Sequence, residues 1–437
     1  MTSKLAFFTI FLIVVNTGFT QQSLLQSGPM VGYSEMKEVA IWAQTNQEAY
    51  VSLSYWEKDL DEKKYQTETI KTTKKTGFTA LLIADSVLPG RLYDYQLIIN
   101  NIPIKRPYPC LFRTQSLWQW RTDPPDFKFV IGSCNYVSES QYDRPGKPYG
   151  GDYGIFKSID QINPEMMLWL GDNIYLREVD WNTQTGINYR YTHTRSLPEM
   201  QPLLARTHHY AIWDDHDFGP NDSHGSFTHK DITLEAFKNF WANPSYGING
   251  KPGITSQFSY NDCDFFLLDN RYNRTPVYDS ANSEILGSEQ IDWLIAALKA
   301  SRSPFKFVAV GGQFLNSAKT YENHSRYPKE RDYILKRIAD ENIKGVVFLN
   351  GDRHHGEISK LTLQNKIDVY DITSSPLTSR AHKKVKEYNE YRVEGSLITE
   401  RHFTVIDVTG AKGERLLTIE SFNTQGESIF TYSINQP

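Results

Sequence analysis

The sequence predicts an α/β (α+β) protein of layered sheets and helices, preceded by a small all-β domain. Residues 30–113 contain strand-like runs with a period of two and no helical period. After residue 126, short apolar runs alternate with amphipathic stretches, which is the pattern of strand, loop and helix. The chain has 437 residues, of which 39% are hydrophobic and 13% aromatic, so two or three domains with a sizeable core are expected.

Composition and charge exclude some classes of protein. A mean hydropathy of -0.51 argues against a protein with many membrane spans. The net charge of -4 and a pI near 6.3 argue against dedicated nucleic-acid binding, for which a basic protein is typical. If the substrate is an anion, cations placed locally must therefore meet its charge.

Residues 1–20 have the pattern of a signal peptide. Lys4 precedes an apolar stretch at residues 5–15, and Gly18 and Thr20 provide small residues at the spacing that a signal peptidase reads. The apolar stretch is too short to span a bilayer comfortably. We therefore exclude this segment from the fold and expect the mature protein to be exported to the periplasm, the cell surface or the medium.

Three cysteines form a poor disulfide framework for an exported protein. Because the number is odd, at least one of Cys110, Cys134 and Cys263 remains unpaired. Cys110 and Cys263 are able to pair, but their separation in sequence predicts nothing about contact. Cys134 differs from both because it follows a predicted strand.

Two domains follow the signal segment. Strand-like runs at residues 39–41, 50–55, 78–83 and 93–99 predict a sandwich of the immunoglobulin or fibronectin type over residues 25–114. A boundary rich in Pro and Asp at residues 123–126 precedes the second domain, residues 127–437. Its predicted strands are 127–131, 166–170, 209–213, 257–260, 265–268, 305–310, 346–349, 367–372, 403–408, 416–422 and 430–434. Its predicted helices are 153–161, 189–207, 232–241, 286–300 and 327–342.

Four strands of the second domain end in small residues followed by metal-ligand types. The residues concerned are Cys134, Asp172 with Tyr175, Asp215 with His216, and Asp352 with His354. Open α/β sheets bind ligands at the carboxyl ends of their strands, so these side chains are expected to converge. A structural zinc site would favour Cys and His alone, whereas hard anionic donors with one thiolate suit iron, and the spare carboxylates suit a second, harder cation.

The ordered set of motifs resembles the PhoD-type alkaline phosphatases, a branch of the calcineurin-like metallophosphoesterases. The resemblance covers most of the chain and predicts the layered sheets of that superfamily. It depends on Gly132-Ser133-Cys134, Gly171-Asp172-Asn173-Ile174-Tyr175, Trp213-Asp214-Asp215-His216-Asp217, Leu268-Asp269-Asn270-Arg271, residues 287–294 and Gly351-Asp352-Arg353-His354.

This resemblance implies two kinds of metal and an activity. It implies a ferric ion, Fe(3+), with four ligands: Cys134, Asp172, Tyr175 and His354. Asp172 would bridge to calcium, Ca(2+), which Asp215 and Asp352 would also bind. Asn221 is carried over as a metal ligand because it follows the histidine motif at the place of a family asparagine. The implied activity is that of an alkaline phosphatase or phosphodiesterase.

The mechanism expected of such a site is hydrolysis by a metal-activated hydroxide. Cations bind the ester oxygens and lower the pKa of bound water from ~16 to ~7. His216 would face the leaving oxygen, either as a proton donor or as a hydrogen-bond donor to the phosphoryl group. Arg271 and Arg353 are candidates to hold the non-bridging oxygens, although Arg271 has the alternative of pairing with a surface carboxylate.

Other readings of the same residues remain open. Asp214, Asp217 and Asp222 either cap the following turn or relay to His216, and His208 and His209 are expected to pack rather than bind a ligand.

The whole protein has two alternative functions. It could be a non-catalytic surface binding protein with a degenerate enzyme domain, or it could hydrolyse a sulfate or other ester. We expect a monomer that acts on small-molecule phosphate esters, with no membrane span.

Overall fold

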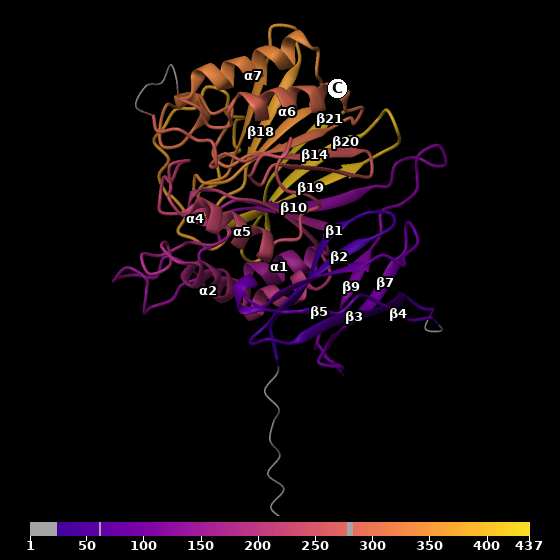
Figure 1. Ribbon diagram of the computed structural model, residues 1–437. Helices are drawn as coiled ribbons and strands as arrows, with labels where there is room; N and C mark the ends of the chain where they lie inside the picture. The colour runs from indigo at the N-terminus through magenta and orange to yellow at the C-terminus, as the bar shows by residue number, and fades with distance from the viewer. Residues whose placement is uncertain (1–23, 61–62, 278–282) are drawn as a thin grey trace, which may run out of the picture.

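The computed structural model describes residues 24–60, 63–277 and 283–437. The predicted signal segment, residues 1–20, lies outside the described residues. Within the described part, none of the helices has the length and apolar character needed to cross a membrane. The N-terminal strands lie at one end of the molecule, and helices α6 (Ser288–Ala300) and α7 (Pro328–Asp340) lie at the other (Figure 1).

The N-terminal strands form two sheets over one hydrophobic core. The three-stranded sheet has the order β1-β2-β6 and the other the order β4-β3-β7-β8, with β5 beside β3 and β9 beside β7. The strands are β1 (Leu25–Ser34), β2 (Val39–Thr45), β3 (Tyr50–Glu57), β4 (Tyr65–Gln66), β5 (Ile70–Lys71), β6 (Thr79–Ala84), β7 (Leu92–Ile99), β8 (Ile102–Pro103) and β9 (Leu111–Arg113). Buried residues of both sheets, among them Ile41 and Leu97, belong to one cluster. Two sheets with a common core are what a sandwich requires; the domain boundaries and the immunoglobulin or fibronectin type stay a prediction.

Two mixed six-stranded sheets build the remainder of the chain. The first has the order β12-β11-β10-β19-β20-β21 and the second β13-β14-β15-β16-β18-β17. Strands β10 to β12 run parallel to one another, as do β14, β15, β16 and β18. The first sheet contains β10 (Phe127–Gly132), β11 (Met166–Leu170), β12 (His208–Ile212), β19 (His402–Thr409), β20 (Leu416–Asn423) and β21 (Ser428–Asn435). The second contains β13 (Ser256–Tyr260), β14 (Cys263–Leu267), β15 (Lys306–Ala309), β16 (Val346–Asn350), β17 (Glu357–Thr362) and β18 (Asp368–Thr373).

The second sheet is buried on both faces, and its sequence explains how. Side chains alternate along a strand. In β15, Phe307 and Ala309 therefore pack into the core shared with the first sheet, whereas Val308 packs toward α6 and α7. Phe129 of the first sheet meets Phe307 edge to face, with 5.0 Å between ring centroids. The layers are thus sheet against sheet with helices outside, the mixed α/β arrangement that the sequence predicts.

Helices complete the outer layers. They are α1 (Ile155–Ile162), α2 (Gln184–Arg195), α3 (Gln201–Leu204), α4 (Asp215–Phe218) and α5 (Lys230–Phe240), together with α6 and α7; single 3-10 turns are η1 (Lys74–Thr76), η2 (Pro198–Met200) and η3 (His324–Arg326). The one helix predicted over residues 189–207 is wrong. It is divided into α2, η2 and α3, because Pro198 cannot continue the hydrogen-bonding of a helix interior.

The N-terminal sheet is fixed to the larger region by hydrogen bonds from its backbone and side chains. Gly28 N donates to Gln201 Oε1 at 2.8 Å, and Trp42 Nε1 donates to the carbonyl of Asn239 at 2.8 Å. His208 is buried between the two regions, where its Nδ1 lies 2.8 Å from the carbonyl of Gly32. His208 therefore packs, as expected. Cys110 and Cys263 are both free thiols.

Candidate metal centre

The candidate site lies where strand ends of both six-stranded sheets meet. Cys134 follows β10, Asp172 follows β11, Asp215 follows β12, and Asp352 follows β16 of the second sheet. Gly351 permits this meeting, because a Cβ there would lie 2.5 Å from Ser133 Oγ and 2.7 Å from the carbonyl oxygen of Leu170. The two sheets could not approach so closely with any larger residue at this position.

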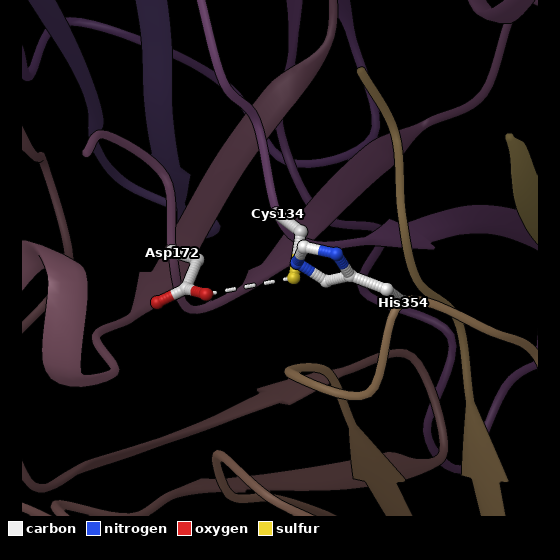
Figure 2. A group of neighbouring side chains, drawn as sticks. All are labelled: Cys134, Asp172 and His354. Carbon is white, nitrogen blue, oxygen red and sulfur yellow. Dashed lines mark hydrogen bonds between the residues drawn. The ribbon is translucent and has the colours of Figure 1, made fainter. Parts of the chain in front are cut away.

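Cys134, Asp172, Tyr175 and His354 come together as one buried group. The thiol of Cys134 lies 3.5 Å from Asp172 Oδ2 (Figure 2), and the Tyr175 hydroxyl donates to the same oxygen at 3.1 Å. The Tyr175 hydroxyl also lies 3.2 Å from His354 Nε2. Figure 2 shows the imidazole of His354 directed at the sulfur of Cys134. Thiolate, carboxylate, phenolate and imidazole donors therefore face one point.

The backbone at these positions is held in an uncommon conformation. Cys134, Asp172, Asp352 and His354 have φ values of 56°, 51°, 68° and 53°, respectively. Non-glycine residues with such left-handed backbone cost free energy and cluster at functional sites, where the surrounding fold holds them in place. Four of the candidate ligands are thus held at strained backbone positions.

Carboxylates extend the group away from Cys134. Ligand-type atoms within 4.8 Å of one another form three further sets that overlap: Asp172, Asp215 and His216; Asp215, Asp222 and Glu322; and Asp214, Glu322 and Asp352. Asp352 Oδ2 is buried and has no hydrogen-bond partner in the described part of the chain; Asp215 Oδ1 has none either, and the nearest cation to it is the Arg271 guanidinium at 3.8 Å. A buried, unpaired carboxylate oxygen is costly unless a cation meets it. A hard cation with oxygen ligands fits these positions.

Without a cation, the protein disfavours the charged forms of Cys134, Asp172, Tyr175 and His354. Burial, together with repulsion from Asp215, raises the pKa of Asp172 well above its usual value. Burial and the nearby Asp172 likewise raise the pKa values of the Cys134 thiol and the Tyr175 hydroxyl. Burial and the neighbouring His382 lower the pKa of His354 to about 3, so its imidazole is neutral and able to bind a metal. A bound cation would lower the pKa values of the acidic donors, because an opposite charge favours their ionised forms. The donor set therefore fits a metal.

His216 lies beside this group on the short helix α4. Its ring stacks on that of Tyr175 with centroids 4.2 Å apart, and its backbone N donates to Asp172 Oδ1 at 3.3 Å. Asp214 and Asp217 form a capping box at the start of α4 and so fix the direction of this helix. Of the two readings left open for Asp214 and Asp217, the structure supports capping.

Arg271 lies among buried acids. Its side chain is fully buried; Nε donates to Asp214 Oδ1 at 2.6 Å, and Nη1 donates to Glu322 Oε1 at 3.0 Å and to the carbonyl of Ser223 at 3.1 Å. Nη2 contacts the same two carboxylates and lies 3.8 Å from Asp215 Oδ1. The guanidinium thus pairs with buried acids rather than with a surface carboxylate, and its role in holding a phosphate oxygen stays a prediction.

Arg353 and Asn221 are the remaining predicted site residues, and they differ in burial. Arg353 is buried, pairs through Nη2 with the half-buried Glu387, and lies 4.2 Å from the ring centroid of Tyr321. Its Nε has no hydrogen-bond partner in the described part of the chain, and its role in holding a phosphate oxygen stays a prediction. Asn221 is exposed on the wall of a cleft that His216 also lines, and its role as a metal ligand stays a prediction.

Sequence reasoning missed several residues around the centre. Ser375 Oγ donates to Cys134 Sγ at 3.1 Å, and Ser379 Oγ lies 3.3 Å from His354 Nε2. Tyr149 places its hydroxyl 3.2 Å from His354 Nδ1. Ser375 follows β18 in a segment of small residues, so the strand-end argument used for the other strands could have found it. Glu322 and Tyr149 lie in loops without a motif.

A cleft of about 930 Å³ opens beside the group. Tyr175 and His216 line it together with Tyr149, Trp181, Ser138 and residues 140–148. It thus connects the candidate metal ligands with the protein surface and provides room for a ligand of substantial size.

Comparison with known proteins places this geometry in a family. The PhoD-like phosphatase family matches residues 129–420. Among solved structures, the chain is similar to that of PhoD, with 17% identity and a TM-score of 0.78 over 95% of this chain and 91% of that chain. It is also similar to the purple acid phosphatase PPD1 from yellow lupin (Lupinus luteus) seeds, with 11% identity and a TM-score of 0.69 over 94% and 74% of the two chains.

At these identities the two structural likenesses concern the fold. Both agree with the layered α/β arrangement described above. No curated protein sequence matches the chain. The family match covers well over half of the chain and includes all the motifs on which the predicted resemblance depends. It therefore confirms that resemblance. The chain belongs to the PhoD-like phosphatase family.

Proposed function

We propose that this protein is an exported, metal-dependent phosphoesterase that hydrolyses small phosphate monoesters and diesters at neutral to alkaline pH, as a monomer. The observation that carries the proposal is the buried convergence of Cys134, Asp172, Tyr175 and His354 from the ends of different strands. Family membership supports the reaction class. The pattern of residues 1–20 supports export.

The chemistry of the donors supports two cations of different character. Cys134, Asp172, Tyr175 and His354 would hold Fe(3+), because a thiolate and a phenolate suit a strongly Lewis-acidic ion. Asp172 would also contact Ca(2+), together with Asp215, Asp352 and Asn221, because calcium prefers oxygen ligands. The bound cations would neutralise phosphate charge and lower the pKa of water in the site.

The residues of the chain itself would orient the ester and move a proton. The imidazole of His216 borders the cleft and is fixed from behind by the ring of Tyr175. From there His216 would donate a proton or a hydrogen bond to the leaving oxygen. Asp214 and Asp217 hold α4, and therefore His216, in place through their capping box. Burial of the donors excludes bulk water, which strengthens each electrostatic contact.

Asp172→Asn tests the proposal, because Asp172 contacts both parts of the centre. Elemental analysis should find iron and calcium in the purified wild type and at least one of them lost in the variant. Hydrolysis of an aryl phosphate should fall by about a thousandfold or more, as expected when the charge holding a catalytic ion is removed. Asp332→Asn, at an exposed position of α7, is the matched control and should retain wild-type metal content and rate.

Three results would contradict the proposal, each in a different way. Wild-type protein that contains metal but hydrolyses no phosphate ester would favour the non-catalytic binding protein. Hydrolysis of aryl sulfate in preference to aryl phosphate would favour another ester. An Asp172→Asn variant that keeps both metals and full activity would remove Asp172 from the centre. Export is checked separately by determining the N-terminal residue of the mature protein, which should follow residue 20.

A further inference from the structure

The cleft beside the metal centre is larger than a phosphate group requires. Its volume of about 930 Å³ is at the upper end of the range for sites that enclose a whole small-molecule ligand. If the scissile phosphate lies at Tyr175 and His216, the rest of the cleft must receive the group esterified to it. The lining residues of that part therefore indicate what the leaving group contains.

Among the described residues, three cationic side chains without acidic partners line the cleft. They are Arg144, Lys147 and Arg380, all exposed. In the described part of the chain, none of the three has an ion-pair partner. The fourth lining cation, Arg177, is neutralised by Asp143 at 2.9 Å. Glu178 then remains as the acidic residue that opposes three cations, so the wall has a net positive charge although the chain as a whole is negative, at -4.

Arg380 connects this wall to the metal centre. Its carbonyl oxygen lies 2.8 Å from Nδ1 of His354, the nitrogen on the far side of the ring from Tyr175. Its guanidinium lies 5.6 Å from the ring centroid of Tyr149 and donates to the carbonyl of Lys147 at 3.4 Å. Arg380 therefore contacts both Lys147 and the candidate metal ligand His354.

The position of these cations argues against a role in holding the scissile phosphate itself. The guanidinium of Arg380 lies over the ring of Tyr149, 5.6 Å from its centroid, and that ring in turn lies 6.4 Å from the ring of Tyr175, the candidate metal ligand. Cations at that place meet an anion that is part of the same substrate but lies farther out. Exposed arginine and lysine without partners are well suited to bind a phosphate, phosphonate or carboxylate group.

We propose that the cleft is a leaving-group subsite, and that the preferred substrate is a phosphate ester whose leaving group carries a second anionic group, bound by Arg380 and Lys147 with Arg144. The inference rests on the proposed phosphoesterase function and adds to it the class of substrate. The aromatic rings of Tyr149 and Trp181 supply apolar faces for the part of the leaving group between its two charges.

Two matched esters test the subsite. Phenyl phosphate and para-(phosphonomethyl)phenyl phosphate have the same reacting bond, and only the second has a further anion, which the enzyme cannot hydrolyse. The wild type should show a kcat/KM at least about tenfold higher for the second ester, the size expected for one charge-assisted contact. Raising the salt concentration should reduce this ratio, because the contact lies at the surface. In the double variant Arg380→Gln/Lys147→Gln the ratio should fall to about one.

A matched control separates this effect from a general loss of positive charge. Lys329→Gln removes an exposed lysine at the start of α7, which does not line the cleft, and should keep the wild-type ratio. Equal kcat/KM values for the two esters in the wild type would overturn the subsite while leaving the phosphoesterase function intact. A ratio that persists in the double variant would remove Arg380 and Lys147 from the subsite and so overturn the assignment.

A binding measurement keeps the subsite testable if no ester is hydrolysed. Calorimetric titration with para-(phosphonomethyl)phenol, the product of the second ester, should show binding to the wild type at least about tenfold tighter than to the double variant. Its neutral analogue para-ethylphenol should bind both proteins equally. Binding of the anionic phenol by a protein without hydrolytic activity would refute the phosphoesterase function and retain the subsite. Equal binding of the two phenols by the wild type would refute the subsite.

Discussion

Replacing Arg271 by methionine should destabilise the protein far more than it weakens substrate binding. Methionine keeps much of the volume but removes the charge from a fully buried side chain. Glu322 would retain a cation, because Arg274 Nη2 lies 2.6 Å from its Oε1. Asp214 would lose the guanidinium whose Nε is 2.6 Å away and would keep a hydrogen bond from Asn270 at 2.7 Å. Asp214 is therefore left without its cation, and Asp215 Oδ1 loses the guanidinium that lies 3.8 Å away.

Removing one partner of a buried ion pair costs about 3–5 kcal/mol, since the remaining charge stays in a low-dielectric environment. The hydrogen bond from Asn270 stabilises the remaining charge of Asp214 in part. We therefore expect the free energy of unfolding to fall by about 3 kcal/mol, the lower end of this range. The assay is urea unfolding followed by tryptophan fluorescence, once with metal and once with chelator, because ligands that bind the native state add stability. The exposed Arg302→Met variant is the control and should differ from the wild type by less than about 0.5 kcal/mol.

The opposite pattern would refute this reasoning. If Arg271→Met unfolds at the wild-type urea concentration while KM for an aryl phosphate rises tenfold or more, Arg271 binds the substrate and not the buried acids. An Arg271→Lys variant gives a graded check. Lysine restores one charge but not the fork of donors that contacts Asp214, Glu322 and Ser223 together, so it should recover only part of the lost stability.

Three further outcomes are expected. Iron-replete wild type should absorb visible light because Tyr175 would bind ferric iron as a phenolate, and Tyr175→Phe should lose the band; a colourless iron-replete wild type would contradict this ligation. Burial lowers the pKa of His208 to about 4, below its unfolded value of 6.5, so its contribution to stability is complete above pH 6.5 and is lost as the pH falls toward 4. This amounts to about 3 kcal/mol, and a His208→Gln variant should be less sensitive to acid in unfolding measurements; equal acid sensitivity would exclude His208. Gly351→Ala should cost about 1–3 kcal/mol, because its Cβ would meet Ser133 Oγ at 2.5 Å, whereas Gly154→Ala, which meets nothing within 4 Å, should be nearly neutral; similar losses in both variants would argue against the close approach.

The strands of the core could be predicted because their signal is local. Residues 166–170 are apolar throughout and form β11, and residues 305–310 contain β15. A strand buried on both faces has such a continuous apolar run, whatever lies next to it. β17 has two half-buried residues and one exposed residue among its six, and no comparable apolar run predicts it. The short helix α4 was also missed, since four residues are too few for a helical period.

The convergence of Cys134, Asp172 and Tyr175, which follow neighbouring strands of one sheet, could also be predicted, for a topological reason. Parallel strands end at the same edge of a sheet, so residues placed just after several such strands are brought together even when they lie far apart in the chain. A turn glycine before Asp172 and another before Asp352 marked those positions. The type of donor at each strand end then indicated a metal rather than a turn.

The sequence by itself thus determined which residues follow the strands and which donors could share a cation. The tertiary structure alone decided what each arginine contacts: Arg271 meets buried acids and Arg353 the half-buried Glu387, whereas Arg380, which no motif marks, lines the cleft. The physical reason is that an arginine side chain takes its partner from whatever carboxylate the packing of distant segments places within its reach. Glu322 and Glu387 come from loops whose positions depend on how the two sheets and their helices stack, and local sequence patterns carry no information about that arrangement.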